Sequence, residues 1–414
     1  MLRRTVTDYH LVLLALVLSL FGLAMVFSAG QTDAPSAVTT VYQKQFVWMM
    51  LGIMAMLVIS RASVRLLDWM SVPLFLVTLL LLVATLVIGT GAGTAASSKS
   101  WIGIGGFRLQ PAEFAKITVV LMLARVLASR RNAPRSLIEL WQPALVVLVP
   151  WVLIMRQPDL GTGIAFIGIF FAMLYWAGVS WPLLLLVASP GISLLLATDT
   201  KLWGGWFLVL IALVLHYRPY LIEGVVLVVS NVIMGILAPT LWNRLSPYQQ
   251  KRLLTFLDPQ ADPRGSAYHV LQSQTAIGSG GWFGQGFTEG SQKRLGYLPA
   301  QHTDFIHAVT GEELGFIGVS VVLVLFLLLF LRTTRIASRA NDSFSGLVAF
   351  GLTASWFVHV LVNVGMTLSL MPVTGIPLPF FSYGGSFMLA SWLTVGILLR
   401  ISSEGRGRAD ALSL

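Results

Sequence analysis

The chain has 414 residues, of which 56% are hydrophobic and only 11% are charged, and its mean hydropathy is +0.81. This composition excludes a water-soluble globular protein and predicts a polytopic membrane protein. The formal net charge is +10, and cysteine is absent, which excludes disulfides, thiolate metal ligands and a cysteine nucleophile.

The first apolar run, residues 9–28, follows Arg3 and Arg4 and has the order of a secretory signal. It is longer than the apolar core of a signal, and many similar runs follow it. We therefore interpret it as the first span.

About twelve apolar runs approach the roughly 20 residues that a helix needs to cross a bilayer. They predict an all-α polytopic membrane protein, with residues 1–414 in one membrane domain. The runs at 46–59 and 202–215 are the weakest candidates, because they are short and interrupted by tryptophan. The runs centre on residues 9–28, 46–59, 70–91, 114–127, 140–155, 164–179, 181–197, 202–215, 221–241, 316–331, 347–371 and 380–399.

Short basic loops predict the orientation, because Lys and Arg near span ends stay in the cytoplasm. If the N-terminus is inside, the segments 130–135 and 332–339 and the C-terminal segment also lie inside. The basic residues of these segments are all arginine. We expect both termini in the cytoplasm and an even number of spans.

Three segments then lie outside: residues 92–111, 243–301 and 372–386. Each is rich in glycine, proline or polar residues and differs from a plain connector. The many cations on this side indicate an anionic partner such as a lipid phosphate.

A cluster of acids and imidazoles at residues 298–313 joins the long outer segment to the next apolar run. Ionisable groups at the edge of the hydrocarbon layer indicate a functional site. Asp304 is the candidate base, with a pKa lowered by a helix N-terminus. Alternatively, Thr303 or Asp304 only caps that helix, or His302, Asp304 and His307 bind a metal, although helical spacing separates the three side chains.

Other polar residues have structural alternatives to a functional role. Glu113 and Lys116 could form a surface pair on one helix, and Asp159 could cap the run at 164–179. Trp101 could be an interfacial anchor.

Several motifs resemble those of the SEDS family (shape, elongation, division and sporulation), in the order of that family and over nearly the whole chain. They are QPAE at 110–113, QPDLGT at 157–162, HTD at 302–304, GEELG at 311–315 and PLPFFSYGGS at 377–386.

The resemblance implies a peptidoglycan glycosyltransferase that polymerises lipid II on the outer face of the bacterial cytoplasmic membrane. It implies a class B penicillin-binding protein as partner, besides membrane lipids, and no nucleic acid. The aspartate of the family's HTD motif falls on Asp304. Substrate contacts are expected from Arg108, Gln110, Glu113, Lys116, Asp159, Lys251, Arg252, Lys293, Arg294, His302 and Ser382.

The reaction inverts the anomeric carbon, and a carboxylate is expected to deprotonate the acceptor hydroxyl. Asp304 takes that role, and cations stabilise the departing pyrophosphate. The sequence identifies no definite cofactor, and Mg²⁺ or Mn²⁺ could bridge phosphates and carboxylates.

The chain departs from the family pattern in two ways. Ala300 and Gln301 stand where relatives carry Glu after Leu-Pro, which weakens an acidic role there. The family core has about ten spans, so residues 198–242 are expected to be an inserted helix pair, followed by an extracytoplasmic segment at 243–310 that carries the active site. Thr374 replaces a lysine common in division proteins and favours the elongation branch.

Two other classes of function fit part of the pattern. A lipid II flippase would suit many spans and interrupted helices, but the motifs crowd on one face and no repeat is visible. A scaffold that only positions the penicillin-binding protein is the third interpretation.

Overall fold

A computed structural model describes residues 8–412 except 34–37, 92–98, 105–106, 246–249, 253, 255, 257–266 and 299. Each predicted apolar run is helical, as expected where backbone groups must be satisfied without water. The helices are α1 (Tyr9–Ala29), α2 (Val41–Ile59), α3 (Val64–Ile88), α4 (Pro111–Ala128), α5 (Trp141–Met155), α6 (Leu160–Trp176), α7 (Trp181–Leu196), α8 (Thr200–Tyr217), α9 (Leu221–Arg244), α13 (Ile306–Ser338), α14 (Ser343–Thr367) and α15 (Gly385–Leu412).

Nine helices of the described part are long and apolar enough to cross a membrane. These candidates include α5 with the preceding 3₁₀ turn Ile138–Leu140, and α15 up to Gly405. Helices α6 and α7 are shorter apolar helices. Helix α4 is as long as α8 but carries Glu113, Lys116 and Arg125. The chain is therefore an all-helical polytopic membrane protein.

Short polar side chains cap the N-termini of several helices. Asp8 accepts a hydrogen bond from Leu11 N at the start of α1, and Asp342 accepts one from Ser345 N at the start of α14. Asp159 caps α6 through Thr162 N, as one interpretation of the sequence predicted. These caps satisfy amide groups that have no partner within the helix.

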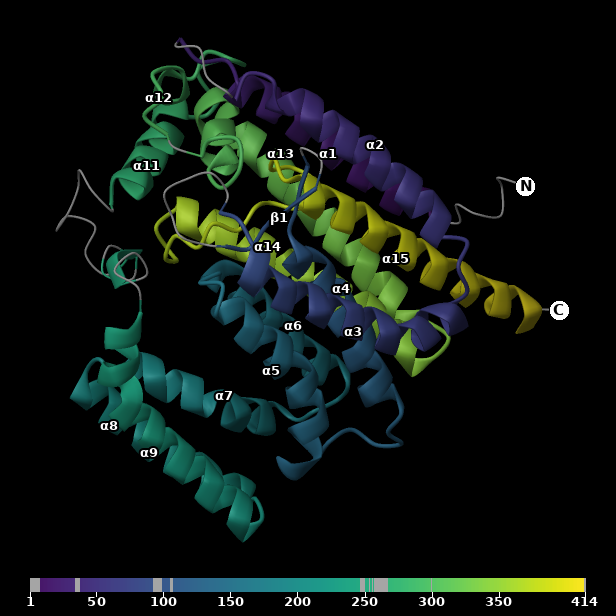
Figure 1. Cartoon of the computed structure of the whole chain (residues 1–414), viewed down its shortest axis with the longest axis vertical. Helices are drawn as coiled ribbons and strands as arrows, with labels where there is room; N and C mark the ends of the chain where they lie inside the picture. Colours follow the sequence, from purple (N-terminus) through teal and green to yellow (C-terminus); the bar gives the residue numbers. More distant parts are fainter. Residues whose placement is uncertain are drawn as a thin grey trace.

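Small residues let the helices of the main bundle approach closely. Helix α2 runs along α15, where Gly52 faces Trp392 and Gly396 faces Ile59. Helix α4 packs against α3, α6 and α14, and α1 packs against α13 (Figure 1).

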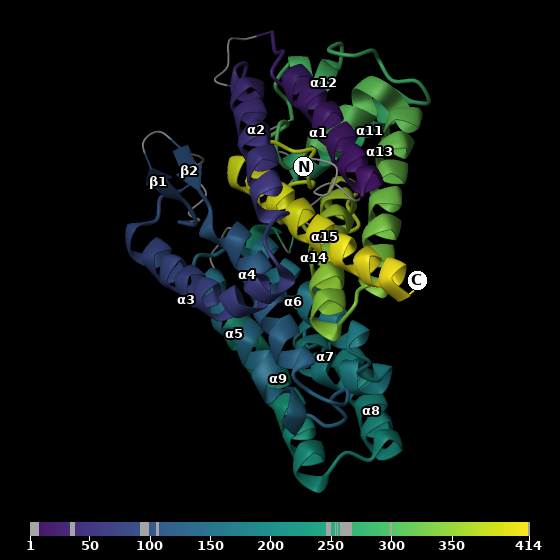
Figure 2. The same ribbon diagram turned by 90° about the vertical axis from the view of Figure 1, so that its right-hand side faces the viewer.

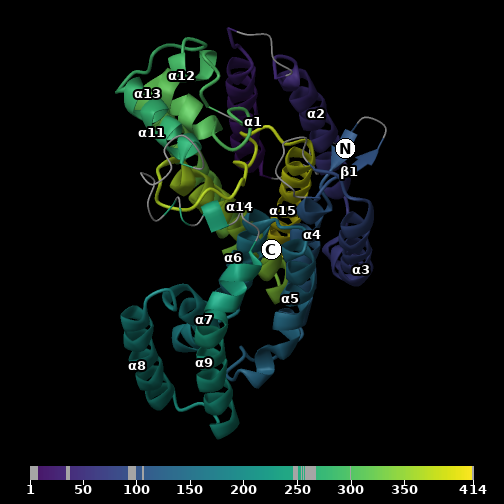
Figure 3. The ribbon, with the colours of Figure 1, turned by 60° about the vertical axis from the view of Figure 1, so that its left-hand side comes forward.

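Helices α7, α8 and α9 form a group at one edge of the molecule, away from α1 and α2 (Figures 2 and 3). Asn231 of α9 donates to Ser189 Oγ and accepts from Ser193 Oγ of α7, at 2.8 and 2.6 Å. Glu223 accepts from Ile138 N and links the group to α5. The predicted pair at 198–242 is thus the helices α8 and α9.

The start of α1 and the end of α15 lie at one end of the bundle, and the start of α13 lies at the other (Figure 1). Asp8 pairs with Arg332 at 2.7 Å and accepts from Ser402, which defines the terminal end. Ser28, at the far end of α1, contacts Glu313 at 2.6 Å, which defines the site end.

The site end carries the remaining elements. Strands β1 (Ile102–Ile104) and β2 (Phe107–Leu109) pair antiparallel, with Gly103 opposite Arg108. Helices α11 (Tyr268–Gly280) and α12 (Ser291–Arg294) form a hairpin that packs on the first turns of α13.

Two helix starts differ from the residue ranges expected from the sequence. The last span begins at Gly385 rather than near residue 380, because the Pro- and Gly-rich segment before it is irregular. Helix α13 begins at Ile306, inside the segment expected to end at residue 310, and breaks at Gly315, whose φ is 65° and ψ is −163°.

Candidate functional site

Asp304 lies in a turn that directly precedes α13. The turn begins at Ala300, whose φ is 50°, and Thr303 N donates to Ala300 O at 3.0 Å. Phe305 is the N-cap residue of α13, and no side chain caps that helix. The interpretation of Thr303 or Asp304 as a cap is therefore wrong, and the carboxylate of Asp304 is not used to start the helix.

The segment 372–384 closes over this turn. Tyr383 N donates to His302 O at 2.9 Å, and the two rings lie 5.7 Å apart. Gly375, with φ 77°, comes so close that a Cβ there would lie 3.4 Å from Asp304 Oδ2. Two segments far apart in sequence thus form one surface around the carboxylate.

Asn363 on α14 holds these two segments together. Its fully buried Nδ2 donates to Asp304 O at 2.9 Å and to Ile376 O at 2.7 Å. Asn363 is not among the site residues predicted from the sequence. A polar side chain inside the apolar run 347–371 is the signal that could have identified it.

The pKa of Asp304 is raised to about 6, mainly because burial removes water from the carboxylate. The Asp159 carboxylate raises it further, while Arg252 and the hydrogen bond with Thr303 oppose the shift. The expected lowering by the helix dipole is wrong, because desolvation outweighs it. A base with this pKa is mostly ionised near neutral pH and can accept a proton.

His302 remains neutral beside Asp304. Burial lowers its pKa to about 4, and its Nδ1 is buried without a hydrogen-bond partner among the described residues. His307, the second residue of α13, lies with its Nδ1 2.9 Å from Thr367 Oγ1. Among the residues that the structure describes, no three His, Asp or Glu side chains come together to hold a metal ion.

Gln110 joins the starts of three helices at the site end. Its Nε2 donates to Asp159 Oδ2 at 3.0 Å, and its backbone N donates to Ser386 Oγ at 3.0 Å. Ser386 Oγ in turn donates to Arg108 O at 3.3 Å. The predicted residues Gln110 and Asp159 therefore belong to one hydrogen-bonded group near Asp304.

Glu113 and Lys116 form an ion pair of 2.8 Å inside the bundle, each 3% exposed, so they are not a surface pair. Lys116 Nζ also lies 2.7 Å from His359 Nε2, while His359 Nδ1 lies 3.0 Å from Pro377 O. Because Pro377 O can only accept, His359 Nδ1 carries the proton and Nε2 accepts from Lys116. The Lys116 ammonium is thus already paired within the protein.

Ser382 is buried and organises its own loop. Its Oγ accepts from Leu378 N at 2.8 Å, and its backbone oxygen accepts from Gln45 Nε2 at 2.9 Å. Gln301 is buried and donates to Ala29 O at 2.7 Å. Both side chains are used for packing the loops of the site end.

The predicted cations differ in exposure. Arg108 and Lys251 are exposed, and partly buried Arg252 is close enough to lower the pKa of Asp304. Arg294 is half-exposed and pairs with Asp33 at 2.9 Å and with Glu289 at 3.1 Å. All of these cations were predicted to contact the substrate. Among them, Arg252 is the one whose charge acts on the Asp304 carboxylate.

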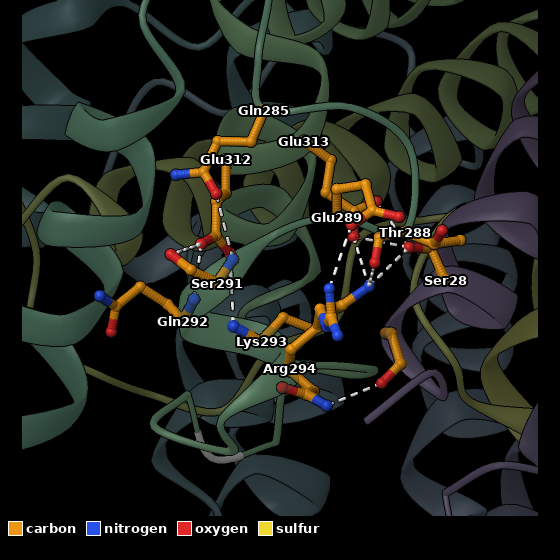
Figure 4. A network of polar contacts seen from close by, with 12 residues as sticks. Ser28, Gln285, Thr288, Glu289, Ser291, Gln292, Lys293, Arg294, Glu312 and Glu313 are labelled. Atoms are coloured by element: carbon orange, nitrogen blue, oxygen red, sulfur yellow. Dashed lines mark hydrogen bonds and ion pairs between the residues drawn. The ribbon is translucent and has the colours of Figure 1, made fainter. Parts of the chain in front are cut away.

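Lys293 is fully buried and bonded to protein atoms (Figure 4). Its Nζ lies 2.6 Å from Glu313 Oε1, 3.1 Å from Ser28 Oγ and 3.0 Å from Thr288 O. Glu312 accepts from Gln292 N at 2.7 Å and fixes α12. The Lys293 ammonium is therefore paired within the protein, and its role in substrate binding stays a prediction.

Comparisons with known proteins agree on one family. The family model described as "Cell cycle protein" (FtsW/RodA/SpoVE) matches residues 9–202 and 200–407. The chain is 35% identical to the peptidoglycan glycosyltransferase RodA of Treponema pallidum (strain Nichols), covering 96% of this chain and 98% of the relative. It is also 35% identical to the probable peptidoglycan glycosyltransferase FtsW of Trichlorobacter lovleyi, covering 96% and 93%.

Solved structures show the same fold. A chain from a structure described as "Structural coordination of polymerization and crosslinking by a peptidoglycan synthase complex" superimposes with a TM-score of 0.70 and 28% identity, covering 95% of this chain and 97% of that one. The rod shape determining protein RodA of Thermus thermophilus gives a TM-score of 0.62 and 26% identity, covering 95% and 96%.

Proposed function

The chain belongs to the FtsW/RodA/SpoVE family of SEDS peptidoglycan glycosyltransferases, and from this premise we propose that it polymerises lipid II with Asp304 as the general base. One observation carries the choice of base. Asp304 is a partly buried carboxylate that caps no helix and has a pKa of about 6. The other acids near it already hold structure: Asp159 caps α6, and Glu312 fixes α12.

The reaction transfers a glycosyl group between two lipid-linked saccharides. The 4-hydroxyl of the acceptor attacks the anomeric carbon of the donor, the bond to the pyrophosphate oxygen breaks, and the configuration inverts. The hydroxyl proton passes to the carboxylate of Asp304, and lipid pyrophosphate leaves with the bonding electrons. General-base assistance of this kind contributes about 10²–10⁴ in rate.

The charge on the leaving pyrophosphate requires cations at the site end. Arg252 is the first choice because it lies near Asp304, and Arg108 and Lys251 are exposed. Mg²⁺ or Mn²⁺, if used, would take phosphate oxygens of the substrate as ligands as well as carboxylates. Gln110, Asp159 and His302 shape the surface that receives the saccharide.

We assign the protein to cell elongation, on the outer face of the cytoplasmic membrane. Thr374, where division proteins commonly carry lysine, supports this assignment. The expected partner is a class B penicillin-binding protein, and the similarity to a chain of a peptidoglycan synthase complex supports such a pairing.

The test is polymer formation from lipid II by the purified, partner-bound protein. We expect Asp304→Asn to fold and bind lipid II but to lose at least about 10² in rate, since an amide cannot accept the proton. Asp199→Asn is the matched control, because Asp199 caps α8 and asparagine retains that role.

Two results would count against the proposal in different ways. Activity of Asp304→Asn above about a tenth of the parent would remove Asp304 as the base. A parent protein that forms no polymer but moves lipid II across vesicle membranes would favour a flippase instead.

A further inference from the structure

An exposed aromatic turn connects α11 to the segment that precedes α12. Trp282 is 68% exposed and Phe283 is 82% exposed. Phe316, at the start of the long apolar part of α13, is 59% exposed and lies edge-to-face against Trp282, with ring centroids 5.2 Å apart. Together, Trp282, Phe283 and Phe316 form the aromatic tip of the hairpin.

The tip is held rigidly against α13 by backbone hydrogen bonds. Phe316 N donates to Gly281 O at 2.9 Å, and Ile317 N donates to Trp282 O at 3.2 Å. On the other side of the turn, Gln285 N donates to Glu312 O at 2.9 Å. The side chains of Glu312 and Glu313 then bind the following segment through Gln292 N and Lys293 Nζ (Figure 4).

The position of the tip along α13 marks the membrane surface. The break at Gly315 separates a buried polar first part of the helix from the part that runs to Ser338. The second part is long and apolar enough to cross a membrane, so its exposed side chains are expected to face lipid. They include Phe316, Ile317, Val321, Val324, Leu327 and Leu331. The tip is therefore continuous with a lipid-facing surface.

We propose that the Trp282–Phe283 turn inserts into the headgroup region of the membrane leaflet on the Asp304 side and anchors the hairpin to lipid. Tryptophan favours this region because its ring is apolar and its N–H is polar. Leaving both rings in water would instead maintain a large apolar surface in contact with solvent. The anchor holds the hairpin, and with it the start of α13, at a fixed depth.

The continuity with α13 favours lipid over a second protein. A partner that docks wholly outside the membrane would require the turn to stand clear of the surface expected to face lipid. Here the rings follow directly from Phe316 and Ile317 on a spanning helix, and the backbone bonds leave the turn little freedom to rise from the surface.

The experiment uses the absence of cysteine from the chain. Phe283→Cys in the full chain is labelled with an environment-sensitive fluorophore, and the protein is reconstituted into vesicles of phosphatidylethanolamine and phosphatidylglycerol. Gln274→Cys, exposed on α11 of the same hairpin, is the water-facing control, and Leu327→Cys is the lipid-facing control. Trp282→Cys is a second tip variant, and thermal unfolding of each labelled protein checks the fold.

We expect the probe at residue 283 to be quenched by lipids spin-labelled near the headgroup and protected from aqueous iodide. The probe at 274 should show the opposite pattern, and the probe at 327 should respond best to deeper spin labels. Iodide quenching at 283 equal to that at 274 would overturn the proposal. Protection that appears only with added transpeptidase, or only at high protein-to-lipid ratio, would also overturn it, in favour of a protein partner or a second copy.

Discussion

Burial determines what each charged side chain of the site end does. Asp304 is partly buried near Arg252 and Asp159, which sets its pKa near neutrality. Lys293, eleven residues earlier in the sequence, is fully buried, and its charge is paired with Glu313. Asp304 is therefore proposed to act in the reaction, whereas Lys293 stabilises the fold. Each role gives a separate prediction.

The pKa of Asp304 predicts the acidic limb of the pH–rate profile. Below about pH 6 the carboxylate is protonated and cannot accept the acceptor's proton, so polymerisation should fall as the pH drops through that value. Arg252→Gln removes a charge that lowers this pKa and should move the limb to higher pH. Asp159→Asn removes a charge that raises it and should move the limb to lower pH.

Initial rates at saturating lipid II, measured across the pH range, test these shifts. Because the two variants are expected to move the limb in opposite directions, a general loss of activity cannot imitate the result. Shifts in the same direction, or none, would mean that another group sets the limb.

Lys293 and Arg294 should differ in stability although they are neighbours. Lys293→Met leaves Glu313 buried without its partner and should cost about 3–5 kcal/mol. Arg294→Gln removes only solvent-screened, half-exposed pairs and should leave the free energy of unfolding almost unchanged. Denaturant unfolding in detergent measures both, and adding Glu313→Gln to Lys293→Met should recover part of the loss. A Lys293→Met protein as stable as the parent but unable to use lipid II would restore the substrate-binding role.

At the scale of elements, glycines allow the hairpin to contact α13 backbone to backbone. A Cβ at Gly284 would lie 2.0 Å from Glu313 O, and one at Gly280 would lie 1.9 Å from Gly311 O. Gly315, at the break in α13, would similarly meet Gly284 N. This contact places the hairpin and the Asp304 turn on one rigid support.

Gly284→Ala should therefore loosen the hairpin. The change forces alanine into a φ of 81° against a backbone oxygen, which costs more than about 1 kcal/mol. Gly278→Ala is the matched control, because that glycine is helical, its added Cβ meets no atom within 4 Å, and alanine is the better helix former. Limited proteolysis and thermal unfolding compare the two. Equal protection of the hairpin in both variants would contradict the close packing.

At the scale of the whole molecule, the terminal end and the site end lie at opposite ends of α1. Asp8, Arg332 and Ser402 meet at the terminal end, and Ser28 meets Glu313 and Lys293 at the site end. Arginine gathers in the loops assigned to the inside, so we place the terminal end in the cytoplasm.

Cysteine labelling in intact cells tests this orientation. An impermeant maleimide should label Gln274→Cys on α11 directly, whereas Asn132→Cys, exposed in the loop after α4, should react only after permeabilisation. Labelling of residue 132 in intact cells together with silence at 274 would reverse the topology and move the polymerisation site to the cytoplasm.

The sequence determined the helices and singled out Asp304 as the proposed base. Apolar runs of sufficient length form helices wherever they occur in a membrane, because each helix satisfies its own backbone groups. The resemblance of the HTD and GEELG segments likewise located Asp304 in chain order. These inferences depend on residues that are close in sequence, so they do not require the arrangement of the helices.

The tertiary structure decided which charges are available and how Asp304 is held. Lys293 meets Ser28 across most of the chain length, and Asn363 joins Asp304 to the segment 372–384. Desolvation and pairing depend on the atoms that surround a group in space. For that reason, the raised pKa of Asp304 and the pairing of Lys293 with Glu313 follow only from the assembled helices.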